Sequence, residues 1–168
     1  FIEGSRTWAH SLAIARDGRI TAAAVLLPMR DMMFSAALDQ GALLNGETLR
    51  VSSQKGFERS EILATRPVLE PHHWSTGTAP QFSRHHRPSL AYRLALIAQG
   101  RFDAMLTLRP SWEWDIAAGA LIVSEAGGTI SDKTGTALKF NNVDPRLNGV
   151  VAAGPNLHSE IIGKLAAA

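Results

Sequence analysis

An α/β domain built in layers is the fold class that the sequence predicts, and three observations carry this prediction. Short β-rich runs separated by turns fill most of the first half of the 168 residues. Helical and strand-like segments alternate in the second half. A hydrophobic content of 45% is enough for one substantial core in a chain of this length. We therefore expect a single domain over residues 1–168, with helices packed on the faces of β-sheets.

Five β-rich runs, each ended by glycine, proline or charged turn residues, predict strands in the first half. They cover residues 10–15, 20–27, 32–37, 41–44 and 61–65. The first two are joined by Arg16-Asp17-Gly18-Arg19, so we expect a β-hairpin there. Asn45-Gly46 follows the fourth run and favours a tight turn, because both residue types tolerate a positive φ angle.

Residues 71–88 are polar, proline-rich and irregular, which indicates a loop. The segment holds four of the six histidines as two adjacent pairs, His72-His73 and His85-His86. Neither pair has the i, i+4 spacing that places two imidazoles on the same face of a helix. We therefore expect solvated histidines there rather than a zinc site.

The second half alternates three predicted helices with two predicted strands. The helices cover residues 89–99, 115–126 and 156–165, and the strands cover residues 102–108 and 149–153. Pro88 precedes the first helix and Gly100 follows it, as is typical of helix boundaries. Gly127-Gly128 ends the second helix, and Asn156 is expected to cap the third.

Composition and charge exclude several classes of function. The chain has no cysteine, which excludes disulfides and thiolate metal sites and favours a cytoplasmic location. No apolar run reaches the roughly 20 residues that cross a bilayer, and we expect no signal peptide. The formal charge is only +2 and no long Lys/Arg run is present, so neither a membrane nor bulk nucleic acid is an expected partner.

Asp115 is the side chain best placed for chemistry, because it stands where the chain passes from a loop into a predicted helix. A carboxylate there lies near backbone N–H groups and the positive end of the helix dipole, and such a hard oxygen ligand suits Mg²⁺. Ala117, Ala118 and Gly119 leave room for another element to pack against the first turns. The alternative is that Asp115 only caps the helix, which is the commoner role of a lone aspartate at this position.

The segment from Trp114-Asp115 to Gly127-Gly128 resembles the C-terminal signature of the inositol monophosphatase family over its whole length. Residues 1–15, 41–52 and 89–104 resemble other segments of that family in the same order, so the resemblance covers nearly the entire chain. It implies a layered αβαβα fold of the sugar-phosphatase type and a homodimer. It also implies a Mg²⁺-dependent hydrolase of small phosphate monoesters, in which Asp115 is a metal ligand.

Two acidic motifs of that family are absent from the chain: an upstream Gly-Glu-Glu and the loop Asp-Pro-Ile-Asp-Gly-Thr. In the family they supply the other metal carboxylates and the threonine that helps to activate water. Because the chain also begins at Phe1, we expect that the N-terminal part of the fold is missing from it. One carboxylate cannot hold several metal ions, so the chain alone is expected to be inactive. The alternative is a non-catalytic binding or regulatory protein that kept the fold without these motifs.

The resemblance leaves the substrate open between two classes. Leu108 stands where inositol phosphatases usually carry a glutamate that binds sugar-like hydroxyls, whereas residues 110–115 look closer to the 3′(2′),5′-bisphosphate nucleotidases. Against the second class, Ala91 stands where those nucleotidases tend to have lysine.

Ser89, Arg109 and Glu113 are the candidate substrate-binding residues. Each has a structural alternative that the sequence leaves open. Ser89 suits a helix cap, Arg109 suits a surface ion pair, and Glu113 suits orientation of the loop before the helix. The four tryptophans are expected to pack in the core or in loops, and they are Trp8, Trp74, Trp112 and Trp114.

Overall fold

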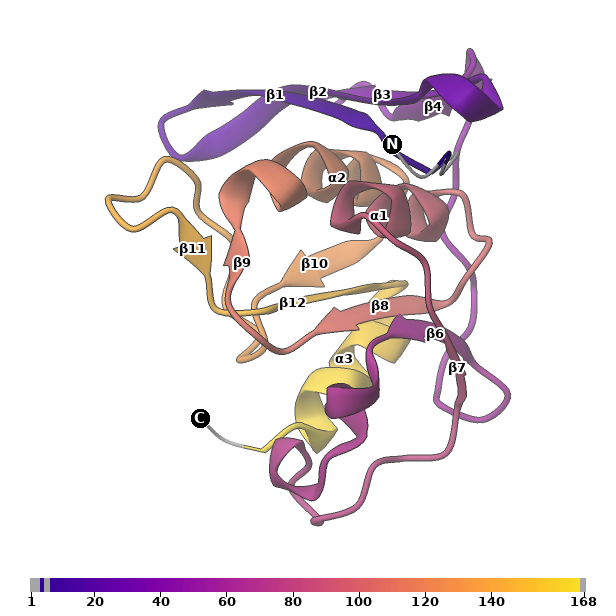
Figure 1. Ribbon diagram of the computed structural model, residues 1–168, viewed down its shortest axis with the longest axis vertical. Coiled ribbons are helices and arrows are strands. Elements are labelled where there is room, and N and C mark those ends of the chain that lie inside the picture. The colour runs from indigo at the N-terminus through magenta and orange to yellow at the C-terminus, as the bar shows by residue number, and fades with distance from the viewer. Residues whose placement is uncertain (1–3, 5–6, 167–168) are drawn as a thin grey trace.

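The computed structural model describes residue 4 and residues 7–166, and its elements lie in layers (Figure 1). A five-stranded antiparallel sheet covers one side of helices α1 (Leu90–Ala98) and α2 (Glu113–Glu125). A second five-stranded sheet lies on the other side of the helix pair, and α3 (Pro155–Lys164) covers the outer face of that sheet. The order sheet, helix pair, sheet, helix confirms the predicted layered α/β class.

The first sheet is a meander whose strands pair antiparallel in chain order. Its strands are β1 (His10–Arg16), β2 (Arg19–Leu27), β3 (Met32–Ala37), β4 (Ala42–Leu44) and β5 (Glu47–Thr48). Pairing along it runs from β1 to β5, with a register shift in β1 between Ile14 and Ala15. The predicted hairpin of the first two strands is confirmed.

The second sheet is mixed and has the order β10-β12-β8-β6-β7. Its strands are β6 (Glu61–Ala64), β7 (Ser83–His85), β8 (Ala104–Thr107), β10 (Thr129–Ser131) and β12 (Val150–Ala153). β6 runs parallel to β7 and β8, whereas β12 runs antiparallel to β8 and β10. The remaining elements are the strands β9 (Ser111–Trp112) and β11 (Arg146–Leu147) and the 3₁₀ turns η1 (Pro28–Arg30), η2 (Arg66–Leu69) and η3 (Pro71–His73).

The first sheet is apolar on both faces. Val25, Leu27 and Phe34 are fully buried on the face that meets α1 and α2. Leu12 and Ile14 of β1 are 63% and 62% exposed on the opposite face, where cross-strand pairing sets them beside alanines of β2. Alternate residues of a strand point to opposite faces of the sheet, so the buried residues face the helices and the exposed ones face outward. An αβαβα order would place a further helical layer on this outer face, and no helix within residues 7–166 lies there.

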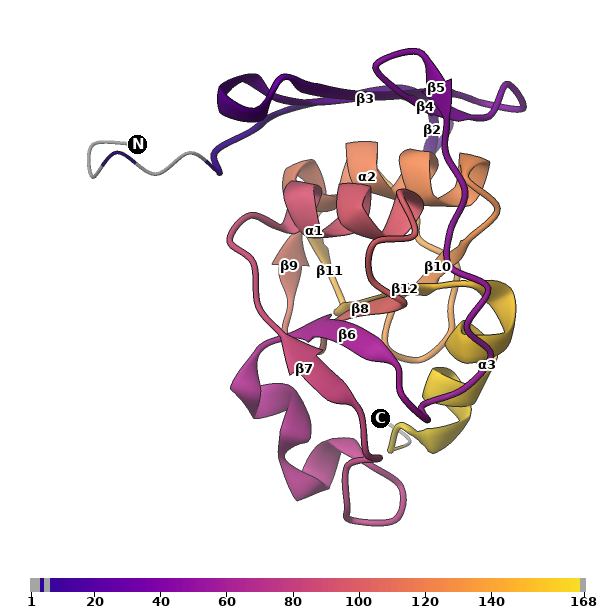
Figure 2. The same cartoon turned by 90° about the vertical axis from the view of Figure 1, so that its right-hand side faces the viewer.

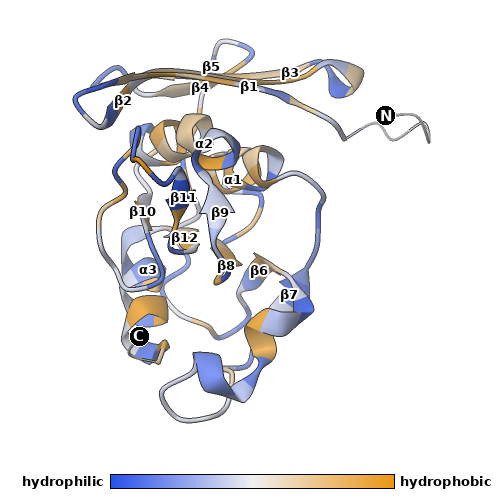
Figure 3. Ribbon diagram, turned by 60° about the vertical axis from the view of Figure 1, so that its left-hand side comes forward, coloured by the Kyte–Doolittle hydropathy of each residue, from blue (hydrophilic) through white to orange (hydrophobic). Residues whose placement is uncertain are grey.

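The helix pair is buried on most sides because it lies between two sheets. Residues 91–98 of α1 and residues 116–123 of α2 are all buried, and Figure 3 shows α2 mostly in apolar colours. Such all-round burial is expected of helices in the centre of a layered domain. Gly119 marks the point of contact, since a Cβ atom added there would lie 2.5 Å from Cβ of Leu94. The small residues of α2 therefore let α1 approach closely, as the sequence predicts.

Two helix starts differ from the sequence prediction. α2 begins at Glu113, so Trp112 is its N-cap residue and Asp115 lies within the first turn. The interpretation of Asp115 as the helix cap is therefore wrong. α3 begins at Pro155, with Gly154 at the N-cap position, so Asn156 does not cap it. Proline is favoured at the first helical position because its missing N–H has no partner there in any case.

Five short strands in the described part of the chain have no counterpart in the sequence analysis, and two of them, β7 and β10, belong to the second sheet. β7 lies inside the predicted loop over residues 71–88, and β10 follows the glycine pair that ends α2. Both have three residues and lie at opposite edges of the second sheet. A run of that length is too short to display the two-residue period of a strand. None of the helices in the described ranges is both long enough and apolar enough to span a membrane.

His158 on α3 is a buried histidine whose surroundings make stability depend on pH. Its side chain is 7% exposed, and its Nε2 atom lies 2.9 Å from Oγ of Ser131. Burial lowers the pKa of His158 below the ordinary value of about 6.5. Between the lowered pKa and about pH 6.5 the folded protein binds fewer protons than the unfolded chain. The free energy of unfolding therefore decreases as the pH falls through this window.

We expect urea titrations to give a lower free energy of unfolding at about pH 5 than at about pH 7, with this residue contributing at most about 1.4 kcal/mol per pH unit. His158→Gln removes the titrating group and should flatten the profile. An unchanged slope in this variant would assign the effect to other histidines, such as His86, whose pKa burial also lowers.

Candidate functional site

Asp115 is the third residue of α2 and is half-buried. The first turn of a helix leaves backbone N–H groups unsatisfied and carries the positive end of the helix dipole, which stabilises a negative charge. Among the described residues, none donates a hydrogen bond to the Asp115 carboxylate. The carboxylate oxygens of Asp115 are therefore available to bind a cation. The helix dipole stabilises the negative charge that such binding requires.

Glu113, two residues earlier, has the opposite character. Its side chain is 8% exposed. Its Oε2 atom accepts a hydrogen bond from the Asn141 backbone at 2.7 Å, and Oε1 accepts bonds from the Asn142 backbone at 3.1 Å and from Nδ2 of Asn142 at 2.6 Å. The carboxylate therefore orients the loop at residues 141–142. The sequence analysis considered orientation of the loop before the helix, but these contacts hold a different loop, at residues 141–142. Substrate binding by Glu113 stays a prediction.

Ser89 lies at the start of α1, at the same side of the molecule as the start of α2 (Figure 2). Its Oγ atom accepts a hydrogen bond from the Tyr92 backbone at 3.3 Å, which confirms a helix cap. Leu94 touches Gly119, and one turn back along each helix lie Leu90 and Asp115. Ser89 and Asp115 therefore lie at nearly the same height along the axes of the two neighbouring helices. Substrate contact by Ser89 stays a prediction.

Arg109 follows β8 and is exposed, and among the described residues it forms no ion pair. Arg93 of α1, which sequence analysis missed, is its electrostatic neighbour: burial lowers the pKa of Arg93, and the charge of Arg109 lowers it further. The Arg93 guanidinium is bonded to the Arg87 carbonyl and to Nε2 of His86, with no carboxylate partner among the described residues. The sequence signal that could have identified Arg93 is that it is the only charged residue in the otherwise apolar helix α1. The end of β8 is therefore a positively charged region, which suits an anionic ligand.

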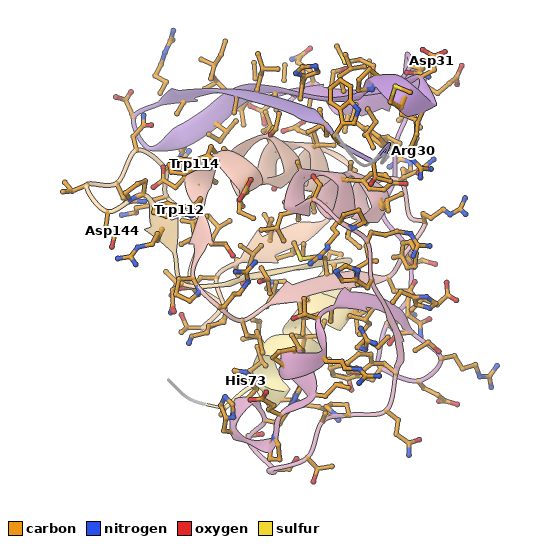
Figure 4. All side chains as sticks on the ribbon, viewed as in Figure 1. Arg30, Asp31, His73, Trp112, Trp114 and Asp144 are labelled. Atoms are coloured by element: carbon orange, nitrogen blue, oxygen red, sulfur yellow. The ribbon has the colours of Figure 1, made fainter. Side chains whose placement is uncertain are left out.

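Trp112 and Trp114 form an exposed stack beside the site (Figure 4). Their ring centroids are 4.7 Å apart with an angle of 10° between the planes, and the side chains are 44% and 58% exposed. The guanidinium of Arg146 lies 5.9 Å from the Trp112 ring. Neither ring packs in the core: Trp112 at the end of β9 and Trp114 in the first turn of α2 are both exposed.

A cavity of about 520 Å³ lies between β1 and the first turns of α2. Ser11, Glu113, Trp114 and Ala117 are among the residues that line it. The Ser11 hydroxyl donates a long hydrogen bond of 3.5 Å to the Trp114 carbonyl. β1 therefore enters the first sheet directly beside the turn that carries Asp115.

The other residues of the recognised segments serve the architecture. Glu125, near the end of α2, accepts hydrogen bonds from the backbone N–H groups of Asp39 at 3.0 Å and Gly41 at 2.8 Å. Asp103 accepts a bond from the Ser52 hydroxyl and another from the Glu61 backbone at 2.7 Å. Sequence analysis assigned no role to either acid. Each carboxylate joins two segments that are distant in the chain.

The residues present fit a Mg²⁺ site in part. Mg²⁺ is typically held by one or two protein carboxylates and retains several waters, and Asp115 offers one unpaired carboxylate of this kind. Glu113 is occupied by its loop. Within residues 4 and 7–166, the only cluster of three convergent acidic or histidine ligands is Glu70, His72 and His73, which does not include Asp115. Asp115 thus supplies a single ligand.

Known proteins resemble this chain in sequence and in fold. A model of the inositol monophosphatase family matches residues 1–168. The Nus factor SuhB of Pseudomonas aeruginosa is 39% identical over 147 residues, which cover 81% of this chain and 53% of that protein. The putative Nus factor SuhB of Neisseria meningitidis is 31% identical over 171 residues, which cover 96% of this chain and 62% of that protein. The chain therefore spans little more than half the length of these relatives.

Solved structures share the fold. SuhB from Bartonella henselae has a TM-score of 0.80 at 27% identity, covering 96% of this chain and 65% of that one. Inositol monophosphatase II from Staphylococcus aureus has a TM-score of 0.82 at 23% identity, covering 97% and 61%, and at this identity the likeness concerns the fold alone. The family model, the sequence relatives and the fold point the same way. This chain belongs to the inositol monophosphatase family.

Proposed function

We propose that the protein containing this chain is a Mg²⁺-dependent phosphomonoesterase of small phosphate monoesters, with Asp115 as one of its metal ligands. The observation that carries the proposal is the unpaired Asp115 carboxylate in the first turn of α2, within the signature segment of a phosphatase family. The two nearby glutamates of α2 differ from Asp115, because Glu113 and Glu125 accept hydrogen bonds from the backbone of neighbouring loops.

The residues of this chain contribute binding and orientation. Asp115 holds a cation at the edge of the site, and the dipole of α2 stabilises the negative charge of its carboxylate. Ser89 presents the start of α1 at the same level, and Arg109 contributes positive charge toward an anionic substrate. When bound, Mg²⁺ neutralises phosphate charge and lowers the pKa of water for an in-line displacement. The remaining carboxylates of the site are proposed to come from segments outside this chain, so the chain alone is inactive.

The substrate is proposed to be an inositol monophosphate or a 3′(2′)-phosphonucleotide. Structures of SaIMPase-II, a neighbour in fold, have been solved with 2′AMP and with inositol monophosphate. Leu108 is 6% exposed and packs in the core, and its apolar side chain has no group that could bind a sugar hydroxyl. The positive charge of Arg109 and Arg93 favours a ligand with more than one anionic group. We further propose a cytoplasmic homodimer that binds neither membranes nor bulk nucleic acid.

A second candidate function rests on the names of the relatives. Proteins that share 37% to 39% identity with this chain are called Nus factor SuhB, a name that specifies no hydrolytic reaction. A binding or regulatory protein that retains the fold is therefore the alternative to the enzyme.

Phosphate release by the full-length protein separates the two candidates. Inositol 1-phosphate and 3′-phosphoadenosine 5′-phosphate are incubated with the protein in Mg²⁺ and in excess EDTA. We expect Mg²⁺-dependent release from at least one of them, with the preferred substrate showing the higher kcat/KM. Hydrolysis of neither, by a protein that is folded by circular dichroism, would contradict the enzyme and favour the binding protein.

A further inference from the structure

The two adjacent histidine pairs of residues 71–88 have similar sequences but different surroundings. In the second pair, Nε2 of His85 lies 3.6 Å from Oε1 of Glu61, whereas Nε2 of His86 lies 2.9 Å from Nη2 of Arg93. This pair is divided between an acid and a buried cation. In the first pair, the ring centroids of His72 and His73 are 3.9 Å apart. Only the first pair brings its two imidazoles together.

Glu70 completes the first pair. Nδ1 of His72 lies 3.5 Å from Oε2 of Glu70, and one ligand atom from each of Glu70, His72 and His73 lies within 4.8 Å of the other two. A tetrahedral Zn²⁺ ion with bonds of about 2.0–2.2 Å holds its ligand atoms roughly 3.3–3.6 Å apart. Glu70 and His72 already have this spacing. The ligand atom of His73 lies within 4.8 Å of the other two, so it has to approach by at most about 1.5 Å.

The local backbone explains why these residues converge without helical i, i+4 spacing. Glu70 is the N-cap residue of the 3₁₀ turn η3, which holds His72 and His73, so the three ligands lie within a single turn of chain. The His73 backbone N–H donates to the Glu70 carbonyl at 3.1 Å and closes the turn. Pro71 fixes its first φ angle. The sequence analysis missed this convergence because it considered α-helical spacing only.

The turn is anchored to the folded core. Trp74 directly follows His73 and is 2% exposed, and its Nε1 atom donates to the Val68 carbonyl at 2.8 Å. The Ala166 backbone N–H donates to the His73 carbonyl at 2.9 Å, and the Ser75 backbone N–H donates to the Lys164 carbonyl at 3.0 Å. The end of α3 therefore holds the backbone that carries the ligands. A fixed backbone leaves only side-chain freedom to be lost on binding.

We propose that Glu70, His72 and His73 form a binding site for one transition-metal ion of the zinc class, with water at the fourth position. Two imidazoles and one carboxylate suit Zn²⁺, whereas Mg²⁺ prefers oxygen ligands. His73 lies far from Trp112 and Trp114, toward the opposite end of the molecule (Figure 4). The zinc site is therefore separate from the site of Asp115 and does not depend on the proposed phosphatase activity.

The test is a calorimetric titration of the full-length protein, without a polyhistidine tag, with ZnCl₂ in excess Mg²⁺. We expect one saturable equivalent of Zn²⁺ in the wild type. His72→Ala/His73→Ala should weaken binding by about 100-fold or more, and Glu70→Gln by about tenfold, since even indirect partners of a metal contribute about 10- to 100-fold. His85→Ala/His86→Ala is the matched control and should bind Zn²⁺ like the wild type.

Equal affinity in the wild type and the His72→Ala/His73→Ala variant would overturn the proposal, and so would an equal loss in the control variant. Absorption by Co²⁺ provides a second measurement on the unmodified protein. We expect the intense visible bands of four-coordinate Co²⁺, and their absence at saturation would also overturn the proposal. Circular dichroism verifies that each variant is folded.

Discussion

Asp115→Asn is expected to abolish Mg²⁺-dependent phosphate release by the full-length protein while leaving its fold intact. Asparagine keeps the size of the side chain but removes the negative charge that holds the cation. Loss of an indirect partner of a metal typically costs about 10- to 100-fold, so we expect loss of a direct ligand to lower kcat/KM by more than about 100-fold. Because no described residue bonds to the carboxylate, the free energy of unfolding should fall only by the dipole contribution, at most about 1 kcal/mol.

Glu113→Gln is the matched control, since it makes the same chemical change two residues away. In the wild type, both carboxylate oxygens of Glu113 accept hydrogen bonds from Asn141 and Asn142. Glutamine replaces one of these oxygens by an NH₂ group, which is a donor and would face another donor. We expect this variant to lose about 1–3 kcal/mol of unfolding free energy. Urea titrations and phosphate-release assays of both variants separate the two roles. Undiminished activity in Asp115→Asn would contradict its assignment as a metal ligand.

Gly119→Ala is expected to destabilise the protein strongly, although alanine is the better helix former. The added Cβ atom would lie 2.5 Å from Cβ and 2.6 Å from Cδ1 of Leu94, so α1 and α2 have to move apart. Overpacking of this kind costs about 1–3 kcal/mol. The cost falls on the contact that sets Asp115 level with the start of α1, and we therefore expect both the unfolding free energy and kcat/KM to decrease.

Gly163→Ala in α3 is the matched control, because it makes the identical substitution in a helix where a Cβ atom meets no heavy atom within 4 Å. Here the helix propensity of alanine should act alone and stabilise the protein by up to about 1 kcal/mol. The same substitution is thus expected to change unfolding free energy with opposite signs at the two positions, which urea titrations measure directly. A stabilised Gly119→Ala variant would show that the helices tolerate the extra methyl group.

The sequence predicted the central elements of the fold because they carry strong local signals. The β-hairpin of β1 and β2 has a turn between two apolar runs, and α1 has a serine cap and a glycine stop. β7 and β10 have three residues each and depend on pairing at the edges of the second sheet. Pairing between distant segments leaves no local pattern, so these strands were not predictable.

The candidate site was predictable only in part. Asp115 was found because it lies within a contiguous signature and at a helix start, which are both local features. Arg93 was missed because its electrostatic surroundings depend on Arg109, which lies in the loop after β8 and is distant from it in the chain. The convergence of Glu70 with His72 and His73 was missed because it arises from a 3₁₀ turn that the proline-rich sequence did not reveal.

The attachment of α2 at both ends has a consequence for divergence within the family. Glu113 and Glu125 hold the loops at residues 141–142 and 39–41, and four of the five hydrogen bonds involved are donated by backbone N–H groups. Every residue type except proline can supply such a donor. The side chains of both loops are thus less constrained than side-chain donors would be, and the remaining constraints are the Nδ2 donor of Asn142 and the positive φ angles of Asp39, Gly41 and Asn141. New ligand preferences can arise around Asp115 without the loss of its position.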